Sequence, residues 1–246
     1  MSSEVWGQET AERYDAEDSG MFAPEVLGPT VDFLTALAGG GPALELAIGT
    51  GRVGVPLRGR GVPVSGIELS EPMAEQLRVK VDEGTLPVTI GDMATTVVEG
   101  CGTFTLVYLV YNTISNLLTQ DEQVACFENA ARHLAPGGRF VVEVGVPPLR
   151  RLPPTQSAVP FDVSDEHVGF DTFELAEQRL VSHHFTRRPD GSWRRGAGRF
   201  RYAWPAELDL MARIAGMALE ARYAGWDRRP FTDESTQHVS VWRRPT

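Results

Sequence analysis

The sequence predicts an α/β fold: a doubly wound, mostly parallel sheet of seven strands that carries a small inserted antiparallel sheet. Three observations lead to this prediction. Between residues 43 and 144, five short apolar segments alternate with segments of helical periodicity, which is the pattern of βαβ units. From about residue 147 to 202, polar and apolar residues alternate in short pieces, as in antiparallel strands. Two further apolar segments then follow a last helix.

The elements of the main domain can be placed in chain order. Apolar residues recur at helical spacing from 24 to 38, and a Gly-rich stretch then ends that helix. Thr119 and Glu122 fit a capping box, in which the two residues satisfy each other's free backbone N–H, so a helix is expected to begin there. Strands are expected at 43–47, 62–68, 86–90, 104–110, 139–144, 219–225 and 237–243, with further helices at 70–81, 119–134 and 205–216.

The same pattern divides the chain into three regions. Residues 1–40 are expected to form an N-terminal helical cap, and residues 41–146 together with 205–246 the main domain. A chain of 246 residues is long for one domain and short for two, which agrees with one domain carrying an elaboration. Residues 147–204 are expected to form the inserted sheet, with a turn at Pro189-Asp190-Gly191 and strands at 168–175, 178–186 and 199–204.

Charge and composition argue against several classes of partner. The net charge of −10 disfavours a nucleic-acid substrate, because a negative surface repels phosphate backbones. No apolar run is long enough to span a membrane, the first residues are acidic and unlike a secretion signal, and two cysteines suggest no disulfide framework. We therefore expect a cytoplasmic monomer or homodimer that acts on a small molecule. A local basic patch is still conceivable at four arginines of the insert: Arg194, Arg195, Arg199 and Arg201.

The most informative segment is Leu-Glu-Leu-Ala-Ile-Gly-Thr-Gly-Arg-Val-Gly at residues 44–54, where the first strand turns into a helix. Glycines at such a turn let a ligand approach the backbone without a Cβ in the way. Gly49, Gly51 and Gly54 also match the dinucleotide-binding fingerprint. That match alone is weak in a chain with 25 glycines, and a plain tight turn is the alternative.

Two acidic residues follow at the carboxyl ends of the next two strands. Glu68 ends the second strand, where a carboxylate can accept both hydroxyls of a ribose. Asp92, in Gly91-Asp92-Met93, ends the third strand, where it can accept a hydrogen bond from an adenine amino group. The alternative for Glu68 is a solvated residue at a strand end, and for Asp92 a turn aspartate. Since open α/β sheets bind ligands at this edge, the two acids together favour an adenosine-containing cofactor.

Four segments of the chain form a specific combination: Glu-Leu-Ala-Ile-Gly-Thr-Gly at 45–51, Gly-Ile-Glu-Leu-Ser-Glu-Pro-Met at 66–73, Gly-Asp-Met at 91–93 and His-Leu-Ala-Pro-Gly-Gly-Arg-Phe at 133–140. In this combination the chain resembles the class I S-adenosylmethionine-dependent methyltransferases. The resemblance covers roughly residues 10–150 and 205–246 and implies a Rossmann-like methyltransferase fold, S-adenosylmethionine as methyl donor and S-adenosylhomocysteine as product. The layout is similar to that of aminosugar N-methyltransferases, which carry a substrate-covering insert, but a shared layout does not determine the substrate.

The resemblance implies a role for each matching position. The methionyl part of the cofactor would lie on the first strand and its glycine loop, at Glu45, Ala47, Gly49 and Gly51. The adenosine would lie at the ends of the next two strands, on Glu68, Leu69, Met73, Asp92 and Met93. The sulfonium end would lie near the end of the fourth strand, with a residue of the N-terminal region covering the cofactor: Val110, Tyr111 and Tyr14.

The glycine loop departs from the family pattern at Ala47 and carries an arginine at position 52. The family's usual first glycine is Ala47 here, and because alanine is the smallest replacement we expect a slightly tighter loop that still binds the cofactor. Arg52 is placed to pair with the cofactor carboxylate, but it could as easily be a surface arginine.

The chemistry itself requires an in-line approach to the methyl group, so positioning supplies much of the rate, and a general base helps a protonated acceptor. The candidate catalytic residues are Tyr111, His183 and His184, although a packed or solvated role is the alternative for the two histidines. Asn112 and Trp226 are candidates for acceptor binding. No proline follows Asn112, so chemistry of the DNA-adenine type is not supported.

The remaining histidines have simpler interpretations. We expect His133 to be a charge at a helix end and His238 to be structural, in the closing strand. His167 joins His183 and His184 in the insert, but their spacing matches no known ligand set, so no metal site is expected.

Three functions stay open at this stage. The main hypothesis is methyl transfer to an O, N or C nucleophile of a small molecule. A nicotinamide-dependent oxidoreductase would use the same glycines, but Glu45 within the first strand, the Gly91-Asp92-Met93 turn and the closing antiparallel strands argue against it. A cofactor-binding protein without turnover is the third.

Overall fold

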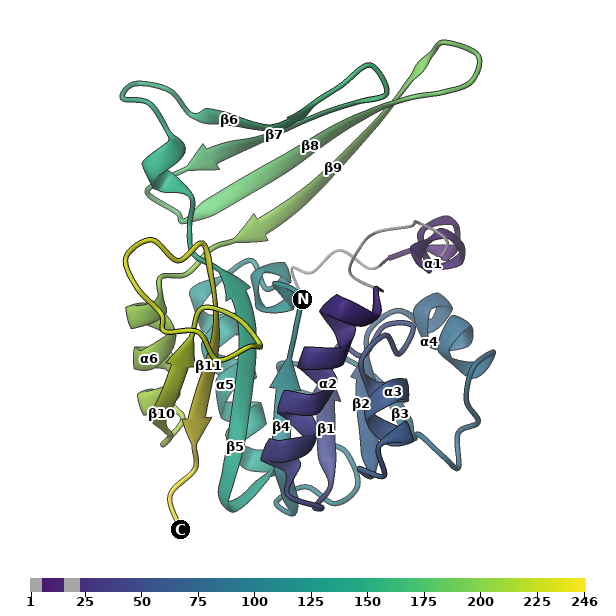
Figure 1. Cartoon of the computed structure of the whole chain (residues 1–246), viewed down its shortest axis with the longest axis vertical. Coiled ribbons are helices and arrows are strands. Elements are labelled where there is room, and N and C mark those ends of the chain that lie inside the picture. Colours follow the sequence, from purple (N-terminus) through teal and green to yellow (C-terminus); the bar gives the residue numbers. More distant parts are fainter. Residues whose placement is uncertain (1–5, 16–22) are drawn as a thin grey trace.

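The structure is a computed structural model that describes residues 6–15 and 23–246, and it consists of a larger sheet with helices on both faces and a smaller sheet above it (Figure 1). The larger sheet has seven strands in the order β10-β11-β5-β4-β1-β2-β3. Strands β1 to β5 are parallel, while β11 runs antiparallel to both β5 and β10. The predicted fold class is confirmed. The strands are β1 (Ala43–Leu46), β2 (Val64–Glu68), β3 (Val88–Ile90), β4 (Phe104–Leu109), β5 (Leu134–Gly145), β10 (Ala218–Tyr223) and β11 (Gln237–Arg243).

The chain reverses direction across the sheet between β1 and β4. From β1 it moves outward to β2 and β3, then returns to β4 on the other side of β1. Loops that leave β1 and β4 therefore separate and open a crevice at the carboxyl ends of these strands, which is where doubly wound sheets bind ligands.

Helices cover both faces of the large sheet, with α2 in front and α5 and α6 behind in Figure 1. On one face, Leu34 of α2 and Leu57 of α3 join a fully buried cluster, and on the other Phe127 of α5 packs on Phe140 and Trp242. The capping box at Thr119 and Glu122 forms as predicted. The helices are α1 (Gln8–Tyr14), α2 (Pro24–Ala38), α3 (Gly54–Gly59), α4 (Glu71–Arg78), α5 (Gln120–His133) and α6 (Pro205–Ile214), with 3-10 turns η2 (Thr113–Asn116) and η3 (Leu149–Arg151).

The insert is a four-stranded antiparallel meander in the order β6-β7-β8-β9. Its strands are β6 (Ala158–Val163), β7 (His167–Glu174), β8 (Arg179–Arg187) and β9 (Trp193–Arg201). The predicted bounds of the last insert strand, 199–204, are wrong. Strand β9 begins at Trp193 and ends at Arg201, because Arg187 pairs with Trp193 directly across the predicted turn. Strand β6 was not predicted, because its residues are mostly exposed and show no clear apolar alternation.

The base of the insert is tied to the main domain by a buried ion pair. Arg201, at the end of β9, donates from Nη1 to Gln123 Oε1 (2.5 Å) and from Nη2 to Glu207 Oε1 (2.6 Å). Gln178, before β8, donates to the other oxygen of Glu207 (2.7 Å). The basic patch suggested by the sequence therefore loses Arg201, whose side chain is 6 % exposed.

His133 is not the exposed helix-end charge that the sequence suggested. Its ring is fully buried; Nδ1 lies 2.8 Å from the carbonyl of Asn129, and Nε2 accepts from the backbone N–H of Val98 (3.1 Å). Burial lowers the pKa of His133, so the neutral ring links α5 to the segment before β4. Across the described parts of the chain, no helix has the length and apolar character needed to cross a membrane. Assembly as a monomer or homodimer stays a prediction.

Candidate cofactor and methyl-transfer site

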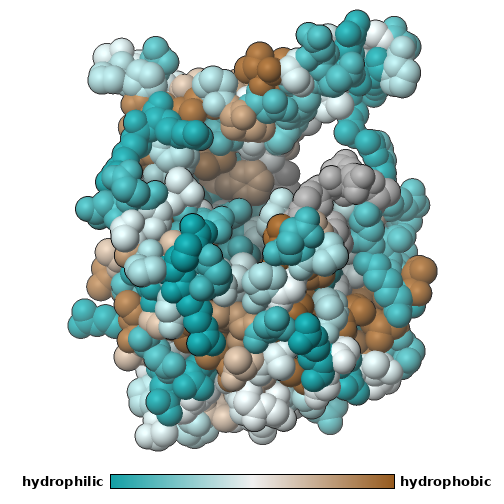
Figure 2. All heavy atoms as spheres, viewed as in Figure 1, coloured by the Kyte–Doolittle hydropathy of each residue, from teal (hydrophilic) through white to brown (hydrophobic). Residues whose placement is uncertain are grey.

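A cavity opens at the carboxyl ends of β1, β2, β3 and β4, below the insert, where Figure 2 shows the surface hollowed between the two sheets. Almost all the residues that the sequence assigned to the cofactor line it: Tyr14, Glu45, Ala47, Gly49, Arg52, Glu68, Leu69, Met73, Asp92, Met93, Val110 and Tyr111. The sequence analysis gave no role to seven further lining residues. Ile48, Thr50, Ser70 and Gly91 lie within the matched segments, whereas Trp6, Thr113 and Asn116 lie outside every motif.

The glycine loop uses the left-handed backbone region three times. Ala47, Gly49 and Gly51 have φ of 53°, 60° and 82°. For Ala47 this conformation costs about 1–2 kcal/mol, which a glycine would avoid. Gly51 does not line the cavity; a Cβ there would lie 2.8 Å from Val55 and 3.0 Å from Leu77. Gly51 is therefore needed for the packing of α3 and α4 against the loop. The structure does not place it in the cavity lining, where the family resemblance had put it.

Glu45 lies in β1, at the floor of the cavity, and is 3 % exposed. Its Oε2 accepts a hydrogen bond from the Tyr108 hydroxyl (2.9 Å). Burial raises the pKa of Glu45 to about 8, although Tyr108 and the nearby Arg52 guanidinium act in the opposite direction. A cationic group in the cavity would favour the ionised carboxylate.

Glu68 connects the end of β2 to the glycine loop. Oε1 accepts from the backbone N–H of Ser70 (2.8 Å) and Oε2 from that of Gly49 (2.7 Å). Each carboxylate oxygen has two lone pairs, so both can still accept a ligand hydroxyl. Burial raises the pKa of Glu68, while these N–H donors oppose the rise.

Asp92 lines the cavity and also accepts a hydrogen bond within its own turn. Its Oδ1 accepts from the backbone N–H of Ala94 (2.8 Å), which closes the turn after β3. Met93 beside it is buried, and its carbonyl accepts from the Asn129 side chain (2.9 Å). Both side chains line the cavity near Glu68 at the β2–β3 end of the site.

Tyr111 and Asn112 follow β4 in a tight turn. Tyr111 is 48 % exposed, and the guanidinium carbon of Arg52 lies 5.1 Å from the centre of its ring. Arg52 is thus part of the site rather than a remote surface arginine. Asn112 faces β5 instead of the cavity: its Oδ1 accepts from the backbone N–H of Gly145 (2.6 Å).

Helix α1 is held over the cavity by contacts that no sequence motif predicted. Asp15 accepts from the Thr50 hydroxyl (2.7 Å) and pairs with Lys80 (2.5 Å), the only lysine in the chain. Tyr14 packs edge-on against Trp6, and burial raises its pKa to about 12. The Tyr14 hydroxyl therefore keeps its proton at neutral pH.

The structure does not bring the other candidate residues to the cavity lining. His183 stacks on Phe170 with ring centres 4.8 Å apart, and His184 lies on the opposite face of β8 beside His167 (3.1 Å). Trp226 packs on Phe33 of α2, 5.4 Å between ring centres. A catalytic role for the histidines and an acceptor contact for Trp226 stay predictions.

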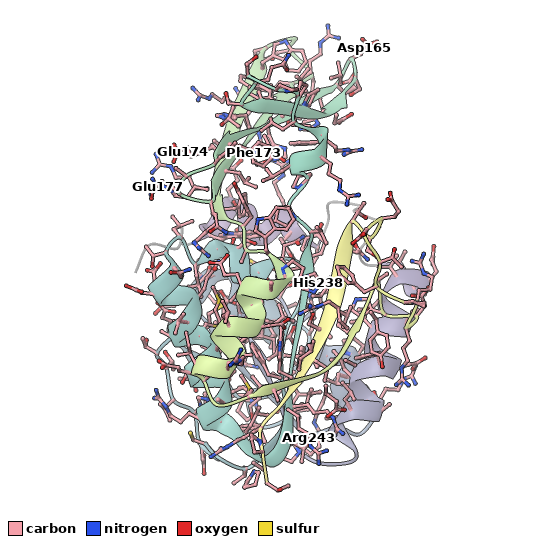
Figure 3. The ribbon with its side chains drawn as sticks, turned by 90° about the vertical axis from the view of Figure 1, so that its left-hand side faces the viewer. Asp165, Phe173, Glu174, Glu177, His238 and Arg243 are labelled. Carbon is pink, nitrogen blue, oxygen red and sulfur yellow. The ribbon has the colours of Figure 1, made fainter. Side chains whose placement is uncertain are left out.

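Ionisable groups also lie outside the cavity, in the insert and in the closing strands. Figure 3 shows Asp165 at the far tip of the insert, Phe173 near its base and His238 among the closing strands. His238 is buried with a pKa lowered to about 4 by burial, and its Nδ1 lies 2.8 Å from Ser240 Oγ, in keeping with a structural residue. Within residues 6–15 and 23–246, no three His, Cys, Asp or Glu side chains are grouped to hold a metal ion.

Comparison with known proteins agrees with this site. The family described as "Methyltransferase domain" matches residues 43–138, the segment that carries the glycine loop, Glu68 and Asp92. The structure of the CcbJ methyltransferase from Streptomyces caelestis superposes with a TM-score of 0.86 and 36% identity over 98% of each chain.

Two curated relatives are similar over part or most of their length. The cypemycin N-terminal methyltransferase of Streptomyces sp is 27% identical over 83% of this chain and 84% of the relative. The dTDP-4-amino-2,3,4,6-tetradeoxy-D-glucose N,N-dimethyltransferase of Saccharopolyspora spinosa is 32% identical over 58% of this chain and 57% of the relative. These similarities leave no support for a nicotinamide-dependent oxidoreductase. The chain belongs to the S-adenosylmethionine-dependent methyltransferases, with S-adenosylmethionine as its methyl donor and S-adenosylhomocysteine as its product.

Proposed function

We propose that this enzyme methylates the amine nitrogen of a small molecule held between the mouth of the cavity and the insert. The observation that carries the proposal is the cavity wall around Tyr111, where η2 adds two uncharged polar side chains, Thr113 and Asn116, and the Arg52 guanidinium lies against the Tyr111 ring. Such a wall suits the neutral amine that attacks the methyl group. Both curated relatives described above are named for nitrogen acceptors: a peptide N-terminus and an amino sugar.

The charge of the protein supports an amine acceptor. With 33 acidic and 23 basic residues, the enzyme attracts a cationic amine over long range, and it repels nucleic acid. An aliphatic amine has a pKa near 10 in water, so it must lose a proton before it attacks. No histidine is among the described lining residues, and Tyr14 with a pKa of about 12 is a poor base at neutral pH.

We therefore infer that orientation and exclusion of water supply most of the rate, with the amine proton lost to solvent before the amine enters the cavity. In this proposal Glu68 accepts from the ribose hydroxyls and Asp92 from the adenine amino group. Glu45, drawn to its ionised form, faces the methionyl ammonium, and Arg52 pairs with the carboxylate. All four side chains line the same cavity, which supports these assignments.

The test is methylation of a small panel of acceptors with S-adenosylmethionine. The panel contains an amino-sugar nucleotide, its hydroxy-sugar counterpart, a short peptide with a free N-terminus and an oligonucleotide. We expect S-adenosylhomocysteine to form, and one methyl group to be added by mass, only with an amine. Methylation of the hydroxy sugar or the oligonucleotide would overturn the proposal. Tight binding of S-adenosylhomocysteine with no turnover of any amine would instead favour a cofactor-binding protein.

A further inference from the structure

The turn at Tyr111 and Asn112 has a strained backbone. Both residues lie in the left-handed region, with φ of 57° and 61°. That conformation costs a non-glycine residue about 1 kcal/mol or more, and it persists only where the surroundings hold it in place. Tyr111 lines the cofactor cavity, so whatever holds this turn also sets the position of a side chain in the site.

Strand β5 supplies the restraint, through Glu143. The Glu143 side chain accepts from the backbone N–H of Tyr111 at Oε2 (3.0 Å), and its backbone carbonyl accepts from the N–H of Asn112 (3.2 Å). Asn112 in turn accepts from Gly145 at the end of β5 (2.6 Å). Three hydrogen bonds thus join two consecutive turn residues to one strand.

The second carboxylate oxygen of Glu143 is held from a distant part of the chain. Its Oε1 accepts from Trp226 Nε1 (2.9 Å), a residue 83 positions later, in the segment between β10 and β11. Trp226 is itself fixed by its edge-on contact with Phe33 of α2. Both oxygens of Glu143 therefore accept from donors whose positions the fold determines, which leaves the carboxylate one orientation.

We propose that Glu143 is a positioning residue for methyl transfer: it holds the Tyr111 turn so that the Tyr111 ring meets Arg52 in the cavity. Trp226 acts through Glu143 without contacting the cavity. The proposal rests on the cofactor cavity and not on the identity of the acceptor. It can therefore fail or succeed independently of amine methylation.

The test measures binding of S-adenosylhomocysteine by titration calorimetry, which needs no acceptor. We expect Glu143→Ala to weaken binding about 5- to 30-fold, because a turn N–H loses a charged partner. The double variant Glu143→Ala with Tyr111→Ala should bind no more weakly than Tyr111→Ala alone, since the first residue acts through the second. Glu143→Gln, which keeps one acceptor oxygen, should recover part of the loss.

Further variants separate positioning from general stability. Glu220→Ala removes a carboxylate that accepts two bonds from Arg139 at the other end of the sheet, and it should leave the affinity unchanged. Trp226→Phe keeps the ring but removes its N–H, and should weaken binding less than Glu143→Ala. If Glu143→Ala fails to fold, Glu143→Gln and Trp226→Phe still decide the question in combination with Tyr111→Ala. Fully additive losses, or an affinity that none of these changes alters, would overturn the proposal.

Discussion

The two sheets of this protein differ in where their polar side chains lie. In the large sheet, β1 and β4 are buried on both faces, and the polar residues of the site lie in and just beyond the strand ends. In the insert, every residue of β8 is at least partly exposed, and polar residues occur along the strand. Parallel strands direct their carboxyl-end loops to one edge, whereas neighbouring antiparallel strands place side chains directly opposite one another.

The consequence is visible in the histidines of the insert. A hydrogen-bonded chain runs from Asp162 to His167 (2.6 Å), then to His184 (3.1 Å) and Ser182 (3.2 Å). These groups satisfy one another within the sheet. The acids of the large sheet, Glu45 and Glu68, instead face a shared cavity. Residue type alone therefore does not distinguish the residues of the site from structural residues. The distinction comes from the strand ends, which converge on the cavity.

The joint between the two sheets should show the largest effect. Arg201→Ala leaves the mostly buried Glu207 carboxylate without its cation and the fully buried Gln123 Oε1 without its donor, and we expect the free energy of unfolding to fall by about 3–5 kcal/mol. Arg199→Ala, exposed on the same strand, should change it by less than about 0.5 kcal/mol. Urea unfolding measures both; equal small losses would show that the joint is not a structural anchor.

Two glycines with the same backbone conformation, one in each region, allow the effect of crowding to be measured. Gly51 and Gly191 have φ of 82° and 83°, but only at Gly51 would a Cβ meet other atoms, 2.8 Å from Val55. Gly191→Ala should therefore lower the unfolding free energy by the conformational cost alone, about 1 kcal/mol. Gly51→Ala should lower it by roughly 1–3 kcal/mol more, from overpacking. Identical losses in urea unfolding would mean that the loop relaxes around the new methyl group.

Cofactor affinity should respond to the large sheet and not to the insert. Glu68→Ala removes a charged acceptor from the ribose and from the N–H groups of Gly49 and Ser70, so S-adenosylhomocysteine binding should weaken by about 1.5–3 kcal/mol. His184→Ala should leave that affinity unchanged, because its hydrogen bonds to His167 and Ser182 lie within the insert. Calorimetry on both variants checks this contrast, and a weakened His184→Ala would bring the insert into the cofactor site.

The last effect concerns pH. Burial raises the pKa of Glu45 from its ordinary value of about 4.5 to about 8, so folding favours the protonated acid. Its stabilising contribution is complete below about pH 4.5 and is lost as pH rises to about 8. Glu45→Gln should lack this pH-dependent component. Urea unfolding of both proteins between pH 5 and 9 tests it: parallel pH profiles would contradict the raised pKa.

Much of the fold and of the cofactor site could be predicted because the signals are local. An apolar strand that ends in glycines predicts a ligand turn at Gly49, and an acid that ends the next strand predicts Glu68. The strand-helix alternation then brings such ends to one edge. Local signals were insufficient for His133, which looked like a helix-end charge until the packing around α5 buried it.

The sequence by itself determined the α/β class, the family and the residues at the strand ends, since each depends on a few neighbouring residues. Only the tertiary structure decided that Glu143 meets both Tyr111 and Trp226, and that Asp15 pairs with Lys80. It also decided that β9 starts at Trp193. These outcomes depend on strand order, register and burial, which bring together residues far apart in the chain.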